Sequence, residues 1–287
     1  MMQRWIWSVV RVGLLCLLAL ALAVGFAPLT FRAARFLQHR PAQIGPKAYY
    51  MALGDSLAYG FQPNLDWADG YANVFFSDLE QHGTQHSINL ACTDESTTTL
   101  IKGGCPFALL RKSLYTSSQL QAAVSYLHAH AGQVSPVTLD IGANDLIPDL
   151  NTTNCSVNAK WESDLATVDN SLKNIILPQL VAAMTVNGQM TGDLLLLNYY
   201  DPYQVTCPNT VPYIHTLNQH LAAAAVASSA TLVDISSAFT GSVVSTSTTP
   251  VSTICTYTWM CSSFKNIHPN KLGYGLMAGV IEHTVSY

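Results

Sequence analysis

Five apolar runs, each followed by a longer amphipathic stretch, constrain the fold of this chain more than any other feature. The runs are apolar at successive residues, as in strands of a parallel sheet that is covered on both faces. They span residues 49–56, 86–92, 137–145, 193–200 and 231–236. The amphipathic stretches predict helices over residues 71–82, 118–131, 161–184, 211–228 and 271–283. This alternation predicts one α/β domain, a three-layer sandwich with a central five-stranded parallel sheet.

The N-terminal segment differs from the rest of the chain in hydropathy. Residues 12–31 carry no charge, and a bilayer span needs about 20 apolar residues whereas a signal-peptide core needs about 7–15. Small residues in this run offer a cleavage site, but the basic residues after it are unusual for a cleaved signal. We therefore expect export, with residues 1–31 as a signal peptide or an N-terminal membrane anchor. Residues 32–47 then form a basic linker, and residues 48–287 form the folded domain.

Beyond this segment the chain is acidic. Five arginines and no acidic residue precede Pro41, which leaves 8 basic against 17 acidic residues after it. Nucleic-acid binding depends on basic patches that neutralise phosphates, and none is visible here. We therefore expect no nucleic-acid partner.

Cysteine usage agrees with export. One cysteine, Cys16, lies in the apolar N-terminal run, and six lie in the domain. An even set in an exported domain predicts three disulfides, for which 15 connectivities are possible. Pairing between sequence neighbours is the preferred arrangement: Cys92–Cys105, Cys155–Cys207 and Cys255–Cys261. A metal site is the alternative, but the sequence has no CxxC pair and no histidine at ligand spacing, so no metal is expected.

Three polar clusters follow predicted strands or begin a helix. The first is GDSLAYG, where Ser56 between glycines is either an exposed nucleophile or a helix cap. The second is IGANDL, where Asn144 is either an amide donor to an oxyanion or a cap. The third is NIHPNKLGYG, where His268 precedes a helix that begins at a proline turn. Ligands of open parallel sheets bind beyond the carboxyl ends of the strands, where these clusters lie. By contrast, residues 240–264 are rich in Ser and Thr and predict a long ordered loop.

Together, and in this order, the clusters resemble the blocks of the SGNH-hydrolase superfamily, also called GDSL esterases and lipases. GDSLAYG matches the nucleophile block, GAND the asparagine block and HPNKLGYG the histidine block. NLACTDESTTTLIKGGC resembles the second block of the disulfide-bearing secreted branch. The resemblance covers most of the chain after residue 48. It implies a flavodoxin-like SGNH fold, no cofactor, and a small-molecule or lipid ester as substrate.

The resemblance also implies a role for each matched residue. Ser56 would attack the ester carbonyl, and His268 would take its proton and return it to the leaving alcohol. The oxyanion would be held by the Ser56 backbone N–H, the Asn144 side chain and the Asp94 backbone N–H. Asp94 stands where relatives have glycine, so a strained backbone and a nearby carboxylate are expected to slow the enzyme.

A second departure concerns the histidine. Relatives place an acid three, or in some cases two, residues before it, but here these positions are Lys265 and Asn266. We expect the main-chain or the side-chain oxygen of Asn266 to accept the hydrogen bond that orients His268. The predicted activity is an exported serine esterase or lipase. The alternatives are an SGNH-fold protein that binds an acyl or glycan ligand without turnover, and an acyltransferase. Aromatic residues near the predicted site favour an apolar acyl or aryl group; they are Tyr59, Phe61, Trp67, Trp259 and Phe264.

Overall fold

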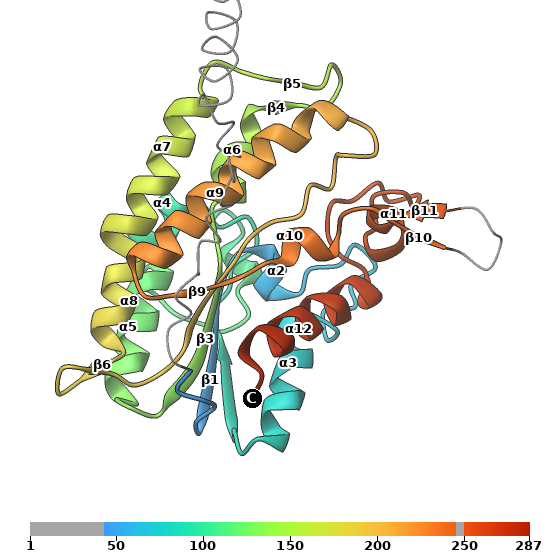
Figure 1. The fold of residues 1–287 in the computed structure, drawn as a ribbon. Helices are drawn as coiled ribbons and strands as arrows, with labels where there is room; N and C mark the ends of the chain where they lie inside the picture. The colour runs from blue at the N-terminus through green and yellow to red at the C-terminus, as the bar shows by residue number, and fades with distance from the viewer. Residues whose placement is uncertain (1–42, 245–249) are drawn as a thin grey trace, which may run out of the picture. The chain divides into compact units, whose positions relative to one another are not determined.

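A computed structural model of the chain describes residues 43–244 and 250–287 (Figure 1). The predicted signal peptide or anchor and most of the basic linker lie outside the described residues. Within the described part of the chain, none of the helices combines the length and the apolar character that crossing a membrane requires.

The centre of the domain is the predicted five-stranded sheet. Its strands are β1 (Tyr49–Gly54), β2 (His86–Asn89), β3 (Val134–Asp140), β8 (Leu194–Leu197) and β9 (Thr231–Val233). They pair in the order β2-β1-β3-β8-β9, and every pair is parallel. This is the strand order of flavodoxin-like folds, in which a ligand crevice opens beyond the carboxyl ends where the order reverses, between β1 and β3. The fold class predicted from the sequence is confirmed.

Helices cover both faces of the sheet and complete the three layers (Figure 1). One face carries α3 (Tyr71–Gln81) and α12 (Lys271–Val285). The other carries α5 (Gln119–Ala129), α7 (Trp161–Ser171), α8 (Leu177–Ala183) and α9 (Val211–Ala227). Every residue of β3 and β8 is buried, because helices cover both of their faces.

Short elements fill the connections. The helical ones are α2 (Ser56–Tyr59), α4 (Thr97–Lys102), η1 (Ala108–Leu110), α6 (Ala143–Leu146), η2 (Ile147–Asp149), η4 (Pro208–Thr210), α10 (Ile235–Ala238) and α11 (Thr253–Tyr257). The strands pair as hairpins: β4 (Leu150–Asn151) with β5 (Ser156–Val157), β6 (Thr185–Val186) with β7 (Gln189–Met190), and β10 (Ser242–Val244) with β11 (Pro250–Ser252).

Every central strand ends two to five residues before its predicted end, and three segments differ most from the sequence predictions. The strand predicted over residues 137–145 ends at Asp140, because Gly142 with φ 122° turns the chain into α6. The helix predicted over residues 161–184 contains a π-helical segment, η3 (Leu172–Ile176), just before the proline near the start of α8. The segment predicted as a loop over residues 240–264 contains the β10–β11 hairpin and α11. The threonines and valines of this segment are β-branched and favour strands, so its sequence suits a hairpin as well as a loop.

The six cysteines of the domain pair as the preferred connectivity predicts. The disulfides are Cys92–Cys105, Cys155–Cys207 and Cys255–Cys261. All three lie in connections outside the five central strands. Disulfides persist in oxidising compartments, so this pairing favours an extracytoplasmic location.

Candidate active site

A tight turn after β1 places Ser56 at the first position of α2. Gly54 has φ 133°, and a side chain there would begin 2.1 Å from the Asp140 carbonyl oxygen, so only glycine fits. Asp55 caps the helix, because its Oδ1 accepts from the Leu57 N–H at 2.9 Å. The capping role that Ser56 could have filled therefore belongs to Asp55. The Ser56 side chain is therefore available for other contacts. The residue is 8% exposed.

His268 lies beside this serine. Its Nε2 is 2.7 Å from Ser56 Oγ, and its Nδ1 is 2.7 Å from Asn266 Oδ1. Asn266 Oδ1 also accepts from the His268 backbone N–H at 3.0 Å, which fixes the carboxamide with its oxygen toward the ring. Nδ1 therefore carries the proton, and Nε2 accepts from the Ser56 hydroxyl. Of the two expected acceptors on Asn266, the side-chain oxygen makes the contact. Lys265, the other residue at an acid position, is exposed.

The surroundings of His268 favour its neutral form. Burial lowers the pKa of His268 to about 4. The carboxamide of Asn266 carries no charge that would offset this effect, and Phe61 packs against the ring at a centroid distance of 4.7 Å. The imidazole is therefore the basic, unprotonated form throughout the neutral range.

Replacing Asn266 with aspartate should change the pH dependence of the reaction. A carboxylate on Nδ1 favours imidazolium, and such a partner raises a histidine pKa by about 1–3 units. The acidic limb of kcat/KM should therefore lie well below pH 6.5 in the wild type and move to higher pH in Asn266→Asp. The matched control is Ser263→Asp, an exposed position in the same loop. An unshifted limb in Asn266→Asp would contradict the contact between Asn266 and His268.

The three donor groups that the sequence predicts for an oxyanion lie after the ends of three strands. Asn144, at the start of α6, uses one N–H of its carboxamide to hold the Glu95 carbonyl oxygen at 3.0 Å. The Glu95 N–H donates to the Cys92 carbonyl at 3.2 Å. This bond closes a turn over residues 92–95, in which Asp94 is the third residue. Over residues 43–244 and 250–287, the backbone N–H groups of Ser56 and Asp94 have no hydrogen-bond acceptor. The three donor groups named from the sequence therefore each retain an N–H that a ligand oxygen can use.

Asp94 adopts the backbone conformation that its glycine counterpart would adopt without strain. Its φ is 66°, in the left-handed region, and its side chain is exposed. Partial desolvation raises the pKa of Asp94. The left-handed region costs an ordinary L-residue about 1–2 kcal/mol, and aspartate tolerates it better than most.

Replacing Asp94 with glycine should therefore increase both stability and turnover. We expect up to about 1 kcal/mol of added stability from the relieved backbone. A higher kcat should follow because a carboxylate no longer lies near the developing negative charge. Thermal unfolding and kcat on a nitrophenyl ester measure the two effects. Asp94→Asn separates them, since it removes the charge while keeping a side chain. A clear fall of kcat in Asp94→Gly would contradict this account.

Two buried carboxyl groups, those of Asp55 and Asp140, lie at the turn that carries Ser56 and were not identified from the sequence. Asp140 accepts from the Tyr71 hydroxyl, from the Asp55 N–H at 3.1 Å and from the Ala58 N–H at 3.3 Å. Asp55 accepts from the Tyr199 hydroxyl at 2.8 Å. Burial and then the charge of Asp55 raise the pKa of Asp140 well above its ordinary value. The one available signal was an aspartate at the end of an otherwise apolar strand run.

An apolar pocket opens beside the Ser56–His268 pair. It has an empty volume of about 580 Å³, part of it open to solvent, and both residues line it. Tyr199, Tyr200 and Tyr203 line it together with the aliphatic residues Leu57, Ala143, Leu146, Ile147, Leu150, Ile214, Leu217 and Ile267. The five aromatic residues considered from the sequence are not part of this lining. Three of them pack elsewhere in the site, since Trp67 contacts Tyr59 and Phe61 contacts His268. The apolar character expected near the site therefore comes from these aliphatic residues and from three tyrosines that were not considered from the sequence.

A flavodoxin-like parallel sheet with these blocks at its carboxyl edge defines a hydrolase of the SGNH class. The family model of the GDSL-like lipase/acylhydrolase family matches residues 52–276, and the chain belongs to this family. The resemblance drawn from the sequence blocks is thereby confirmed. No curated protein matches the chain.

Solved structures of lipases and esterases share the fold. A lipase from a goat rumen metagenome is 16% identical, with a TM-score of 0.55, covering 83% of this chain and 97% of its own. An extracellular lipase from Streptomyces rimosus is 15% identical, with a TM-score of 0.50 and coverages of 83% and 99%. An acetylxylan esterase from Geobacillus stearothermophilus is 12% identical, with a TM-score of 0.51 and coverages of 86% and 97%. At these identities the similarity concerns the fold.

Proposed function

We propose that this protein is an exported serine hydrolase that cleaves carboxylic esters with an apolar acyl group. The observation that carries the proposal is the 2.7 Å contact between His268 Nε2 and Ser56 Oγ at an apolar pocket. A serine hydroxyl is a weak nucleophile until a base accepts its proton, and a neutral imidazole in hydrogen-bond contact supplies that base.

In the proposed acylation step, Ser56 Oγ bonds to the ester carbonyl carbon as its proton passes to His268 Nε2. The carbonyl oxygen becomes an oxyanion that accepts from the N–H groups of Ser56 and Asp94 and from the Asn144 carboxamide. The intermediate collapses when the bond to the alcohol oxygen breaks. His268 gives its proton to that oxygen, so an alcohol leaves and an acyl-Ser56 ester remains.

Deacylation reverses the roles with water. His268 takes a proton from a water molecule as the water oxygen bonds to the acyl carbonyl carbon. The carbonyl oxygen again becomes an oxyanion, which accepts from the same donors. The bond to Ser56 Oγ then breaks, and His268 returns the proton to Oγ. A carboxylic acid leaves. Asn266 holds the Nδ1 proton throughout, and its neutral oxygen stabilises imidazolium less than a carboxylate would.

A fluorophosphonate probe tests the nucleophile directly. We expect one label per chain, located at Ser56 by mass spectrometry, and no label in Ser56→Ala. The control is Ser77→Ala, an exposed serine on α3. A folded wild-type sample that stays unlabelled would refute the proposal and favour a binding protein without turnover. Analysis of the products separates hydrolysis, which releases the acid, from transfer to an added alcohol.

The pocket predicts a preference among acyl groups. Ile214 lines the pocket from α9, so Ile214→Trp should fill the space that a longer acyl chain would occupy. The ratio of kcat/KM for octanoyl over acetyl nitrophenyl esters should fall by at least about tenfold. The control is Val226→Trp, at a 73% exposed position of the same helix. An unchanged ratio in Ile214→Trp would place the acyl group elsewhere.

Export is proposed on the pattern of residues 12–31 together with the three disulfides. Both a cleaved signal and a retained anchor fit this proposal. N-terminal sequencing of the exported protein distinguishes them, since a cleaved form begins within or after residues 12–31 whereas a retained anchor begins near Met1.

A further inference from the structure

We propose that Gln119 and Glu95 act as a pair of positioning residues that hold the nucleophile turn and the oxyanion donors in one fixed geometry. This inference rests on the proposed function, because it concerns how that reaction is supported. Neither residue reaches the Ser56–His268 pair itself. Their role is to join segments that are distant in the sequence and adjacent in the site.

Gln119, the first residue of α5, forms hydrogen bonds with the end of β1. Its Oε1 accepts from the Gly54 N–H at 2.6 Å, and its Nε2 donates to the Gly54 carbonyl at 3.0 Å. Gly54 lies two residues before Ser56, and both of its backbone polar groups are thus held by a single side chain. Because a backbone N–H can only donate and a carbonyl can only accept, the orientation of the carboxamide is fixed.

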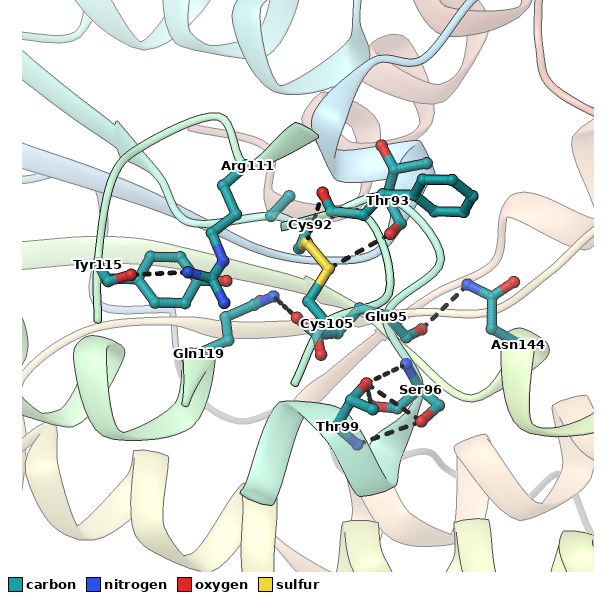
Figure 2. The surroundings of a disulfide bond; sticks show 12 residues. Cys92, Thr93, Glu95, Ser96, Thr99, Cys105, Arg111, Tyr115, Gln119 and Asn144 are labelled. Carbon is teal, nitrogen blue, oxygen red and sulfur yellow. Dashed lines mark hydrogen bonds between the residues drawn. A yellow bond between two sulfur atoms is a disulfide. The ribbon is translucent and has the colours of Figure 1, made fainter. Parts of the chain in front are cut away.

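The same carboxamide reaches the segment that follows β2. Its Nε2 also donates to Glu95 Oε2 at 3.0 Å, and the Glu95 carbonyl in turn accepts from the Asn144 carboxamide at 3.0 Å. Figure 2 shows Gln119 and Asn144 meeting Glu95 from opposite sides, next to the Cys92–Cys105 disulfide. A continuous series of hydrogen bonds therefore runs from Gly54 through Gln119 and Glu95 to Asn144. It connects the ends of β1, β2 and β3, which are the three sources of the oxyanion donors.

Burial makes these contacts specific. Gln119 and Glu95 are each 1% exposed, so a polar atom that loses its partner here cannot turn to bulk water. Glutamine is the side chain that supplies an acceptor for the Gly54 N–H together with donors for the Gly54 carbonyl and for Glu95. Glutamate would set a second oxygen against the Gly54 carbonyl and against the Glu95 carboxylate. Methionine has a similar volume and makes none of the three bonds.

The energetic consequence should appear in the transition state. Oxyanion donors act through their placement relative to Ser56, and a misplacement of about 1 Å far from the chemistry can cost on the order of 10²-fold in rate. Without Gln119, the turn that carries Asp94 and the Asn144 side chain lose this side-chain connection to Gly54, while the backbone bond from the Cys92 N–H to the Gly54 carbonyl at 3.2 Å remains. Substrate binding in the aliphatic pocket does not involve Gln119, so KM should change little.

The test compares Gln119→Met with Gln121→Met, a matched control at an exposed position of the same helix. Active sites are first titrated with a fluorophosphonate at a temperature well below unfolding, and kcat is then expressed per labelled Ser56. We expect kcat to fall on the order of 10- to 100-fold in Gln119→Met, with KM within about threefold and Gln121→Met unchanged.

A second pair of variants detects the bond between the two residues. Gln119→Glu should lose activity most strongly at high pH and recover part of it as the pH falls, because protonation relieves the contact between the two acids. Adding Glu95→Gln should restore part of kcat at pH 8, since the new amide can donate to the carboxylate at position 119. These variants serve as the test should Gln119→Met fail to fold.

The outcomes of these experiments distinguish failure of the positioning role from failure of the proposed function. If the wild type is labelled and Gln119→Met has the kcat of Gln121→Met, the positioning role is wrong while the proposed function stands. The same holds if Glu95→Gln gives no recovery in the Gln119→Glu background. If folded wild-type protein takes no label, the proposed function is wrong and this inference falls with it.

Discussion

Replacement of His268 with alanine is expected to lower kcat by roughly 10⁵- to 10⁶-fold, the largest effect predicted for this protein. The imidazole is the only base in contact with Ser56 Oγ among the described residues. Without it, the hydroxyl must lose its proton to water, and the leaving alcohol must depart without a proton donor. The remaining rate would come from the oxyanion donors and from substrate binding.

The measurement is steady-state hydrolysis of a nitrophenyl ester, with circular dichroism to establish folding. His215→Ala is the control, since His215 is exposed on α9. His268 is one of many residues that line the acyl pocket, so its loss should weaken substrate binding little, and KM should change far less than kcat. Activity of a folded His268→Ala sample within tenfold of the wild type would show that another group serves as the base.

The second large effect is expected for Asn144→Ala. Removal of one oxyanion donor typically costs about 10²–10³-fold in kcat, equivalent to about 2.7–4 kcal/mol in the barrier. The loss should fall on kcat, because an ester carbonyl carries little charge until the transition state. Asn144 also holds the Glu95 carbonyl, so alanine should in addition lower the stability of the segment that carries Asp94.

Active-site titration separates these two consequences of Asn144→Ala. A variant that labels fully at Ser56 yet turns over slowly has lost transition-state stabilisation, whereas a variant that labels only in part has lost structure. The exposed Asn170 on α7 offers a matched control. A fully labelled Asn144→Ala with less than a tenfold loss of kcat would assign the oxyanion to backbone donors alone.

The sheet could be predicted because its strands carry their signal locally. Leu194–Leu197 is buried on both faces, and such a run is incompatible with an exposed surface in any fold. The ends of the strands could not be predicted in the same way. The sequence around Asp140 continues with the apolar Ile141, and the strand ends because Gly142, with φ 122°, turns the chain. Hairpins such as β10–β11 were missed because their Ser/Thr-rich strands lack the alternation that identifies a half-buried strand.

The residues of the candidate site likewise divide into those that the sequence could identify and those that it could not. Ser56, Asn144 and His268 lie in short blocks, so the sequence alone could identify them. The orienting contact could be narrowed to Asn266, but the choice between its two oxygens depends on a side-chain torsion that only the structure supplies. Gln119 could not be identified, because its partner Gly54 is 65 residues away and the sequence shows only a residue at the start of a helix.

The disulfides cross-link the connections near the candidate site and not the central sheet. Cys92 and Cys105 bracket the turn that carries Asp94, Cys155–Cys207 joins the connections after β3 and β8, and Cys255–Cys261 closes a loop just before the histidine segment. The five central strands contain no cysteine. We therefore expect mild reduction to lower the proposed activity before the central sheet unfolds.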